Sequence, residues 1–201
     1  MVFTIGYIVE GHGEVEAVPI LIRRLALQID PTLYVNIPPP IRISKSKLVK
    51  EGELEKAVEL IARKVAPAGA ILVLLDSDED CPATLGPTLL ARAKLARSDL
   101  PVTVVLAKHE YEAWFLAAAP SLRGQRGLRD DLERPNDPEA IRGAKEWLSD
   151  RMPDNQSYVE TLDQPAFTKS FDLDQARQSD SFDKCRREVE RLLRDLRNAQ
   201  A

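Results

Sequence analysis

The sequence predicts an α/β fold in which a parallel sheet of about four strands is flanked by helices. Four apolar segments rich in β-branched residues recur along the first 120 residues, and helix-forming segments alternate with them. The apolar segments are continuous, which is typical of strands that are covered on both faces. Strands that alternate with helices in this way pair in parallel through right-handed crossovers.

The elements can be placed from the spacing of apolar residues and from the turn-forming residues between them. Predicted strands span residues 3–9, 32–37, 71–75 and 101–107. Predicted helices span residues 14–30, 51–66, 83–97 and 110–119. Pro19 falls near the first turn of the first helix, where its missing N–H costs least.

The composition changes after Pro120. Residues 121–157 are rich in Arg, Asp, Glu, Gly and Pro, and only 139–148 reads as a short helix. The segment 181–201 repeats apolar residues on one helical face, so we expect an amphipathic helix packed on the sheet. We therefore predict an α/β domain at 1–120 and a mostly helical extension packed on it at 121–201.

Composition and charge favour a cytoplasmic protein without a membrane partner. The chain carries 28 Lys and Arg against 32 Asp and Glu, a net charge of -4, so overall charge does not indicate nucleic-acid binding. The two cysteines, Cys81 and Cys185, match no metal or redox spacing, which is typical of a reducing compartment. No apolar run approaches the length of a membrane span, and the first residues do not resemble a signal peptide.

Acidic residues follow three of the four predicted strands. They are Glu10 and Glu14 after the first, Asp76, Asp78 and Asp80 after the third, and Glu110 and Glu112 after the fourth. Ligands of open parallel sheets bind beyond the carboxyl ends of the strands. If these three strands are neighbours, at least four carboxylates meet at one edge, where Mg²⁺ or Mn²⁺ would offset their repulsion. An exposed acidic loop is the alternative interpretation.

Two short motifs resemble the Toprim domain of topoisomerases, primases and OLD nucleases. VEGHGE follows the first strand and DSDED follows the third, and in that family a Glu ends the first strand and a DxD pair ends a later one. The match covers about residues 3–119. The whole chain is also similar to a small bacterial family of Toprim-like proteins, through the segments EGHGE, DSDED, EYEAW, DQPAF and DLDQAR.

The resemblance implies a Mg²⁺-dependent (or Mn²⁺-dependent) nuclease that cleaves phosphodiester bonds, with DNA as the expected substrate. Genes of the small family often lie beside ATPase genes in apparent defence islands, which implies a role in phage defence. The core metal ligands would be Glu10, Asp76 and Asp78, with Glu14 and Asp80 as further ligands. Glu10 could instead act as a general base.

Other residues near the predicted edge have weaker assignments. Lys108 could stabilise the transition state, or it could be a solvated surface lysine. Glu110 and Glu112 are two residues apart on a predicted helix, so at most one should reach the site. His12 and His109 could move protons, although loop histidines without a role are common. Gly11 and Gly13 would permit a tight turn and the approach of a phosphate, or form an ordinary strand-to-helix turn.

Two basic segments could position nucleic-acid phosphates. The first is an acid-free strip that alternates partly like an edge strand and contains Arg42, Lys45, Lys47 and Lys50. The second contains Arg123, Arg126 and Arg129. Either segment could also be ordinary solvated surface.

A different class of function is also open. The protein could be a non-catalytic or conditionally active subunit that docks on a partner ATPase through its last helix and its Arg-rich segment. A phosphatase with an Asp nucleophile also begins from DxD, but there the motif follows the first strand, which here ends at Glu10. A topoisomerase would need a catalytic tyrosine on a second domain, and a primase a larger nucleotide-binding apparatus. The sequence leaves RNA open as a substrate, and the oligomeric state unknown.

Overall fold

The computed structural model describes residues 2–199 and confirms an α/β fold with a parallel sheet. Residues 1, 200 and 201, at the ends of the two predicted segments, lie outside the described residues. The strands are β1 (Val2–Val9), β2 (Tyr34–Asn36), β3 (Ile41–Arg42), β4 (Gly69–Asp76) and β5 (Val102–Ala107). Their order is β2-β1-β4-β5, and β3 pairs with the last two residues of β1 after β2 has ended.

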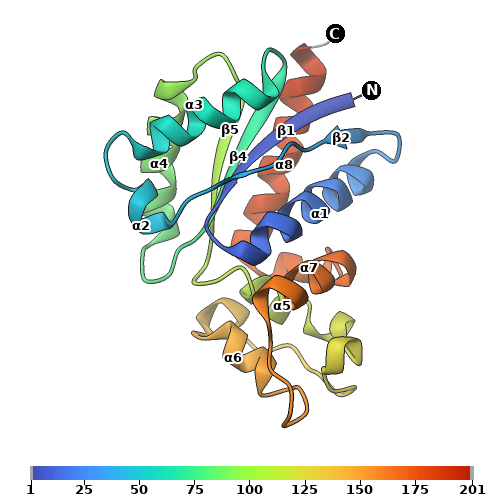
Figure 1. Ribbon diagram of the computed structural model, residues 1–201. Coiled ribbons are helices and arrows are strands. Elements are labelled where there is room, and N and C mark those ends of the chain that lie inside the picture. Colours follow the sequence, from blue (N-terminus) through green and yellow to red (C-terminus); the bar gives the residue numbers. More distant parts are fainter. Residues whose placement is uncertain (1, 200–201) are drawn as a thin grey trace.

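Helices cover both faces of this sheet (Figure 1). The α-helices of the described residues are α1 (His12–Ile29), α2 (Lys45–Leu48), α3 (Glu53–Val65), α4 (Pro82–Ala96), α5 (Ala113–Ala117), α6 (Ala144–Ser149), α7 (Glu160–Ser170) and α8 (Asp180–Ala199). Of these, α1, α3, α4 and α8 pack on the sheet. Alternate residues of β4 enter two separate cores: Leu72 and Leu74 pack with α1 and α8, and Ile71 and Val73 pack with α3 and α4. Both faces of the strand are therefore apolar, which explains its continuous apolar sequence.

The segment between β5 and α8 lies beyond the carboxyl ends of the strands, at the opposite end of the molecule from the two termini (Figure 1). There α7 packs along α1, and α8 returns to pack on β5. Aromatic rings from α5, α7 and α8 join in edge contacts, such as Phe115 with Phe167 and Phe171 with Phe182. One continuous core links this segment to the α1 face of the sheet.

Three predictions about helices need correction. The predicted helix 110–119 is only α5, followed by a 3-10 turn at Ala119–Leu122. The predicted helix 139–148 divides into a 3-10 turn at Pro138–Ala140 and α6, because Gly143 between them adopts a left-handed conformation. The basic strip was expected to alternate partly like an edge strand, but only Arg42 lies in a strand, β3, while Lys45 and Lys47 lie in α2.

Helix α7 was not predicted at all. It contains Pro165 in its interior, and its buried face includes the polar residues Asp163 and Gln164, so its apolar residues do not mark one side. The amphipathic C-terminal helix was predicted, and α8 does pack on the sheet. Among residues 2–199, none of the helices combines the length and the apolar composition that a membrane crossing requires.

The packing of α3 on β1 yields a stability prediction at Gly6. A Cβ atom at Gly6 would lie 2.6 Å from Ile61 Cγ1 and 2.8 Å from Val65 Cγ1. Gly6→Ala should therefore lower the free energy of unfolding by about 1–3 kcal/mol through overpacking. Urea unfolding followed by circular dichroism measures the change.

Gly86 in the interior of α4 is the matched control, because its added Cβ would meet no atom closer than 3.7 Å. Gly86→Ala should raise the free energy of unfolding by about 0.5–1 kcal/mol, the gain in helix propensity. Equal effects at the two positions would contradict the close approach of α3 to β1.

Candidate functional site

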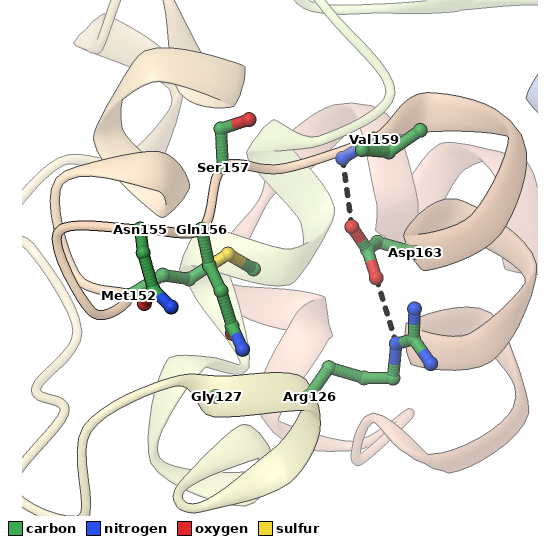
Figure 2. Close-up of a pocket in the computed structure, with 8 residues that line it drawn as sticks. All are labelled: Arg126, Gly127, Met152, Asn155, Gln156, Ser157, Val159 and Asp163. Carbon is green, nitrogen blue, oxygen red and sulfur yellow. Dashed lines mark hydrogen bonds and ion pairs between the residues drawn. The ribbon is translucent and has the colours of Figure 1, made fainter.

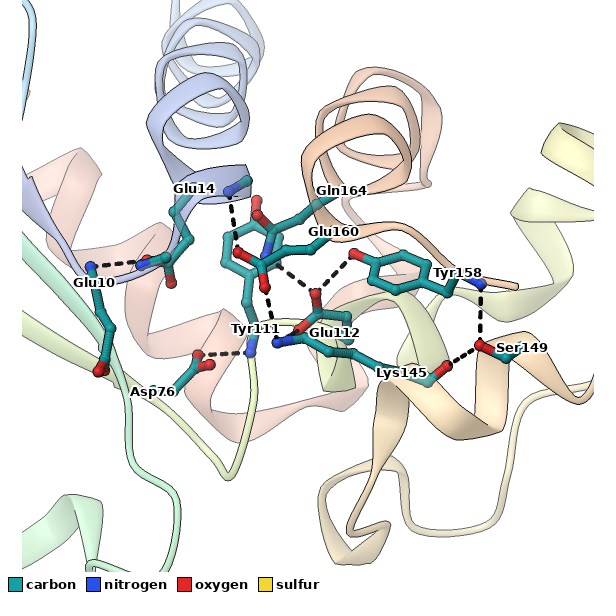
Figure 3. A network of polar contacts seen from close by, with 12 residues as sticks. Glu10, Glu14, Asp76, Tyr111, Glu112, Lys145, Ser149, Tyr158, Glu160 and Gln164 are labelled. Atoms are coloured by element: carbon teal, nitrogen blue, oxygen red, sulfur yellow. Dashed lines mark hydrogen bonds and ion pairs between the residues drawn. The ribbon is translucent and has the colours of Figure 1, made fainter. Parts of the chain in front are cut away.

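Two acidic residues stand at the carboxyl ends of adjacent strands. Glu10 follows the last residue of β1, and Asp76 is the last residue of β4. The two strands pair in parallel, with Ile8 opposite Val73, so both acids lie at the same edge of the sheet (Figure 3). Since β5 pairs with β4 on its other side, the three strands that carry the acids are neighbours, as the prediction required.

Glu14 lies beside them and closes the first turn of α1. Its Oε2 accepts hydrogen bonds from the backbone N–H of Glu10 at 3.0 Å and of Gly11 at 2.8 Å. Burial, together with the charges of Glu112 and Glu160, outweighs the two N–H donors and raises the pKa of Glu14 to about 7. The carboxyl group is thus poised between its charged and neutral forms near neutral pH.

Glu112 is the acid from the β5 side that joins this group. Its side chain is fully buried, and its Oε1 accepts hydrogen bonds from the Tyr158 hydroxyl at 2.7 Å and from Gln164 Nε2 at 3.2 Å. Its Oε2 has no hydrogen-bond partner among the described residues. Burial raises the pKa of Glu112 to about 7, although the Lys145 ammonium and the Tyr158 hydrogen bond favour the charged form.

Asp76 completes a group of three neighbouring carboxyl groups, Glu14, Asp76 and Glu112, which we call the acid cluster. Asp76 Oδ1 accepts a hydrogen bond from the backbone N–H of Tyr111 at 2.8 Å. Desolvation raises the pKa of Asp76 well above its usual value, and the charges of Glu14 and Glu112 raise it further. Such a cluster holds protons unless a cation offsets the repulsion.

The closest cation from the chain itself comes from α6. Lys145 Nζ lies 3.2 Å from Glu160 Oε2 and 4.0 Å from Glu112 Oε2. Burial lowers the pKa of Lys145, but the charges of Glu112, Glu160 and Asp76 outweigh burial and raise it overall. Figure 3 shows Lys145 reaching toward Glu112 and Glu160 at the side away from Glu10.

Sequence reasoning missed every partner that the extension supplies. Lys145 lies in the predicted helix 139–148 but was given no role, and Tyr158 and Glu160 lie in a polar segment without periodicity. Gln164 lies within the DQPAF segment, which was noted for its resemblance but given no role. Gln164 is buried and donates a hydrogen bond to Glu112, so this segment holds the Glu112 side chain in place.

The glycines of the first loop serve a different purpose from the one expected. A Cβ at Gly13 would lie 2.3 Å from Gln164 Oε1 and 2.7 Å from the Glu160 carbonyl oxygen. The Gly13 N–H donates to Glu160 Oε1 at 3.0 Å. The close approach at this loop is therefore made by α7, and the space expected for a phosphate is filled by a carboxylate.

Asp78 does not lie beside Asp76 as the extended alternation predicted. The strand ends at Asp76, and Asp78 adopts a left-handed backbone with φ of 48°, so the alternation stops before it. Lys45 Nζ instead contacts Asp78 Oδ2 at 2.5 Å, Asp80 Oδ2 at 3.1 Å and the Ser77 carbonyl oxygen at 2.7 Å. This internal ammonium offsets the charge at the tip of the DSDED segment.

The residues of the predicted basic strip, Arg42, Lys45, Lys47 and Lys50, differ in how accessible they are to a ligand. Lys45 is buried in that contact and is not available to a phosphate as predicted. Arg42 is exposed, and its Nη1 reaches the Glu10 carbonyl oxygen at 3.4 Å, which places it next to the acids. Lys47 pairs with Glu53 at 3.6 Å, and Lys50 is exposed.

The remaining candidates are dispersed. Each arginine of the second basic segment pairs with an acid: Arg123 with Glu133, Arg126 with Asp163 and Arg129 with Asp131.

The other predicted residues near the strand ends lie in different surroundings. Lys108 lines a cavity of about 280 Å³ with Cys81 and Lys184, next to α8. His109 Nδ1 lies 2.7 Å from the Asp78 carbonyl oxygen, and His12 is exposed on α1. Glu110 lies close enough to Glu112 to raise its pKa.

The donor chemistry of the acid cluster suits a hard divalent cation. It offers carboxylate oxygens whose charges repel one another, and one buried oxygen without a partner. Across residues 2–199, however, no three His, Cys, Asp or Glu side chains are already arranged to hold an ion. Binding would therefore require the flexible side chains at the strand ends to turn toward a shared point.

The raised pKa values predict an unusual pH dependence of stability without metal. Between the ordinary pKa of 4.5 and the raised value of about 7, the native protein keeps a proton on Glu112 that the unfolded chain releases. The free energy of unfolding should therefore fall as pH rises through this window, by on the order of 2 kcal/mol. Urea unfolding in EDTA between pH 4.5 and 8 measures it.

Glu112→Gln removes the titration and keeps an oxygen that can accept from Tyr158. It should reduce this pH dependence, while Glu14 keeps its own contribution, and should raise the stability at pH 8 relative to the wild type. Glu51→Gln, at an exposed acid, is the control and should leave the slope unchanged. An unaltered slope in Glu112→Gln would mean that Glu112 is not the group that holds the proton.

Comparison with known proteins assigns a family but no activity. No curated protein and no solved structure matches the chain. One family model, described as a domain of unknown function (DUF4276), matches residues 9–190. The matched residues include the acid cluster and the α6 and α7 residues that contact it. The match covers most of the chain, so this protein belongs to the DUF4276 family.

Proposed function

We propose that this protein is a Mg²⁺-dependent enzyme of the nuclease type that cleaves phosphodiester bonds, with Mn²⁺ as a substitute. The observation that carries the proposal is the convergence of Glu10, Asp76, Glu14 and Glu112 at the carboxyl edge of a parallel sheet. This edge is where open α/β sheets place their ligands. The resemblance of VEGHGE and DSDED to the Toprim domain supports the same function.

Glu10 and Asp76 would hold the cation, with Glu14 and Glu112 as the further carboxylates. When bound, Mg²⁺ would supply activation of water and stabilisation of the leaving oxygen. The raised pKa values favour this arrangement, because a divalent cation replaces protons on carboxyl groups that repel one another. Asp78 and Asp80 are held by Lys45, so we assign them to shaping the loop.

The chain's own groups can move a proton and orient a substrate. Glu112 has a pKa of about 7, so it can accept or release a proton near neutral pH. Tyr158 and Gln164 fix one of its oxygens and leave the other unbonded. Arg42, exposed beside the Glu10 backbone, is the basic residue best placed to hold a substrate phosphate.

A conditionally active subunit that works with a partner ATPase is the second candidate. The observation that favours it is the cover formed by α6 and α7, where Lys145 pairs with Glu160 and Glu160 binds the Gly13 N–H. A partner that moved these helices would expose the acid cluster. A role in phage defence is supported only by the resemblance to the small Toprim-like family.

The direct test is cleavage of supercoiled plasmid DNA, and of a labelled RNA, by the purified protein with Mg²⁺ or Mn²⁺. Asp76→Asn should reduce the rate more than about 100-fold, the loss expected for a metal ligand. Asp80→Asn is the matched control from the same segment, and it should stay within several-fold of the wild type because Asp80 contacts Lys45.

Equal rates in the wild type and in Asp76→Asn would show that any cleavage comes from a contaminant. Activity that appears only when a partner ATPase is added would favour the second candidate. If neither substrate is cleaved and Mn²⁺ does not bind by calorimetry at about 1 mM, the metal-dependent proposal is wrong.

A further inference from the structure

A polar cavity lies beside α7, and none of the acid-cluster residues lines it. It measures about 480 Å³ and is bounded by the 3-10 turn Gln125–Gly127, the loop 152–157 and the start of α7 (Figure 2). Asp163 on α7 lines it, while Glu160 and Gln164 of the same helix contact Gly13 and Glu112. The cavity and the acid cluster are therefore separate sites.

Arg126 is the cationic residue of this cavity, and its side chain is held in place. Its Nε donates to Asp163 Oδ1 at 2.7 Å, and Asp163 Oδ2 accepts from the Val159 N–H at 2.7 Å. Asp163 is only 4% exposed, so both of its oxygens are committed to these partners. The two terminal nitrogens of Arg126 find no acceptor within residues 2–199, which leaves one edge of a fixed guanidinium open.

The backbone that presents Arg126 is constrained. Arg126 has φ of 52° and ψ of 28°, a left-handed conformation that costs a non-glycine residue on the order of 1 kcal/mol. Gly127 follows with φ of 89°, and a Cβ there would lie 2.3 Å from Gln156 Oε1. The turn is thus pressed against the loop 152–157, and such conformations are concentrated at ligand sites.

The rest of the lining supplies neutral hydrogen-bonding groups. Asn155, Gln156 and Ser157 all line the cavity, and their side chains are exposed and carry no hydrogen bond to another part of residues 2–199. Figure 2 shows these three side chains on the loop across the cavity from Asp163. One open guanidinium edge with several neutral donors suits a ligand that carries several acceptor oxygens.

We propose that this cavity is a binding site for a phosphate group, carried either by a nucleotide or by a nucleic-acid strand. The paired N–H groups of Arg126 would take two phosphate oxygens, and the amide and hydroxyl donors of the loop would take a third. Neither nitrogen of this edge is used in the fold, so the ligand would displace no contact. The site does not depend on the proposed cleavage reaction.

Binding can be tested with the full chain in EDTA, so that no divalent cation contributes. Calorimetry would use AMP, with succinate as a control anion, and fluorescence anisotropy would use a labelled single-stranded oligonucleotide. Arg126→Gln should weaken binding at least about 10-fold, the loss expected for a charge-assisted contact. Arg129→Gln is the matched control, because Arg129 pairs with Asp131 and does not line the cavity.

Arg126→Gln leaves Asp163 without its partner, so circular dichroism must confirm that the variant folds. Gln156→Ala and Ser157→Ala keep the Arg126–Asp163 pair and should each weaken binding several-fold. Binding of AMP would identify a nucleotide site, and binding of the oligonucleotide alone would identify a strand site, provided that either depends on Arg126.

Three results would overturn the proposal. One is the absence of binding of both phosphate probes at about 1 mM. Another is binding of succinate as tight as that of AMP, and the third is unchanged binding in folded Arg126→Gln. None of them bears on cleavage at Asp76, so failure here and failure of the proposed nuclease activity remain distinguishable.

Discussion

The mutual repulsion of three poorly solvated carboxyl groups is the physical constraint on which the rest of this molecule depends. Glu14, Asp76 and Glu112 come from three separate places in the chain. The charge of Glu112 raises the pKa of Glu14, and the charges of Glu14 and Glu112 raise the pKa of Asp76. Parallel pairing of β1, β4 and β5 forces their positions to converge. An arrangement that costs free energy in the absence of a cation is typical of a functional site.

The C-terminal extension is what makes this cluster a buried one. Tyr158 and Gln164 fix Glu112, while Lys145 and Glu160 form an ion pair above the start of α1. The extension also shares one hydrophobic core with the α1 face of the sheet. The extension therefore both packs on the sheet domain and supplies residues that surround the acid cluster. Helix α7 contacts the acid cluster through Gln164 and the cavity at Arg126 through Asp163.

The sheet and the convergence of Glu10 and Asp76 could be predicted, because apolar continuity marks buried strands and parallel pairing aligns their ends. The position of Asp78 could not be predicted, because side chains alternate only within the strand and the strand ends at Asp76. The partners of Glu112 lie 46 and 52 residues away in sequence, and Glu160 is 147 residues from Gly13. Contacts of this range leave no periodicity, and the buried polar face of α7 concealed the helix that makes them.

The measurement that tests the central claim most directly is a crystal structure of the protein soaked in Mn²⁺, with anomalous scattering used to locate the ion. The account predicts a peak between the carboxylates of Glu10 and Asp76, with Lys45 still bound to Asp78. An anomalous map without a peak at these two residues, from crystals saturated with Mn²⁺, would contradict it.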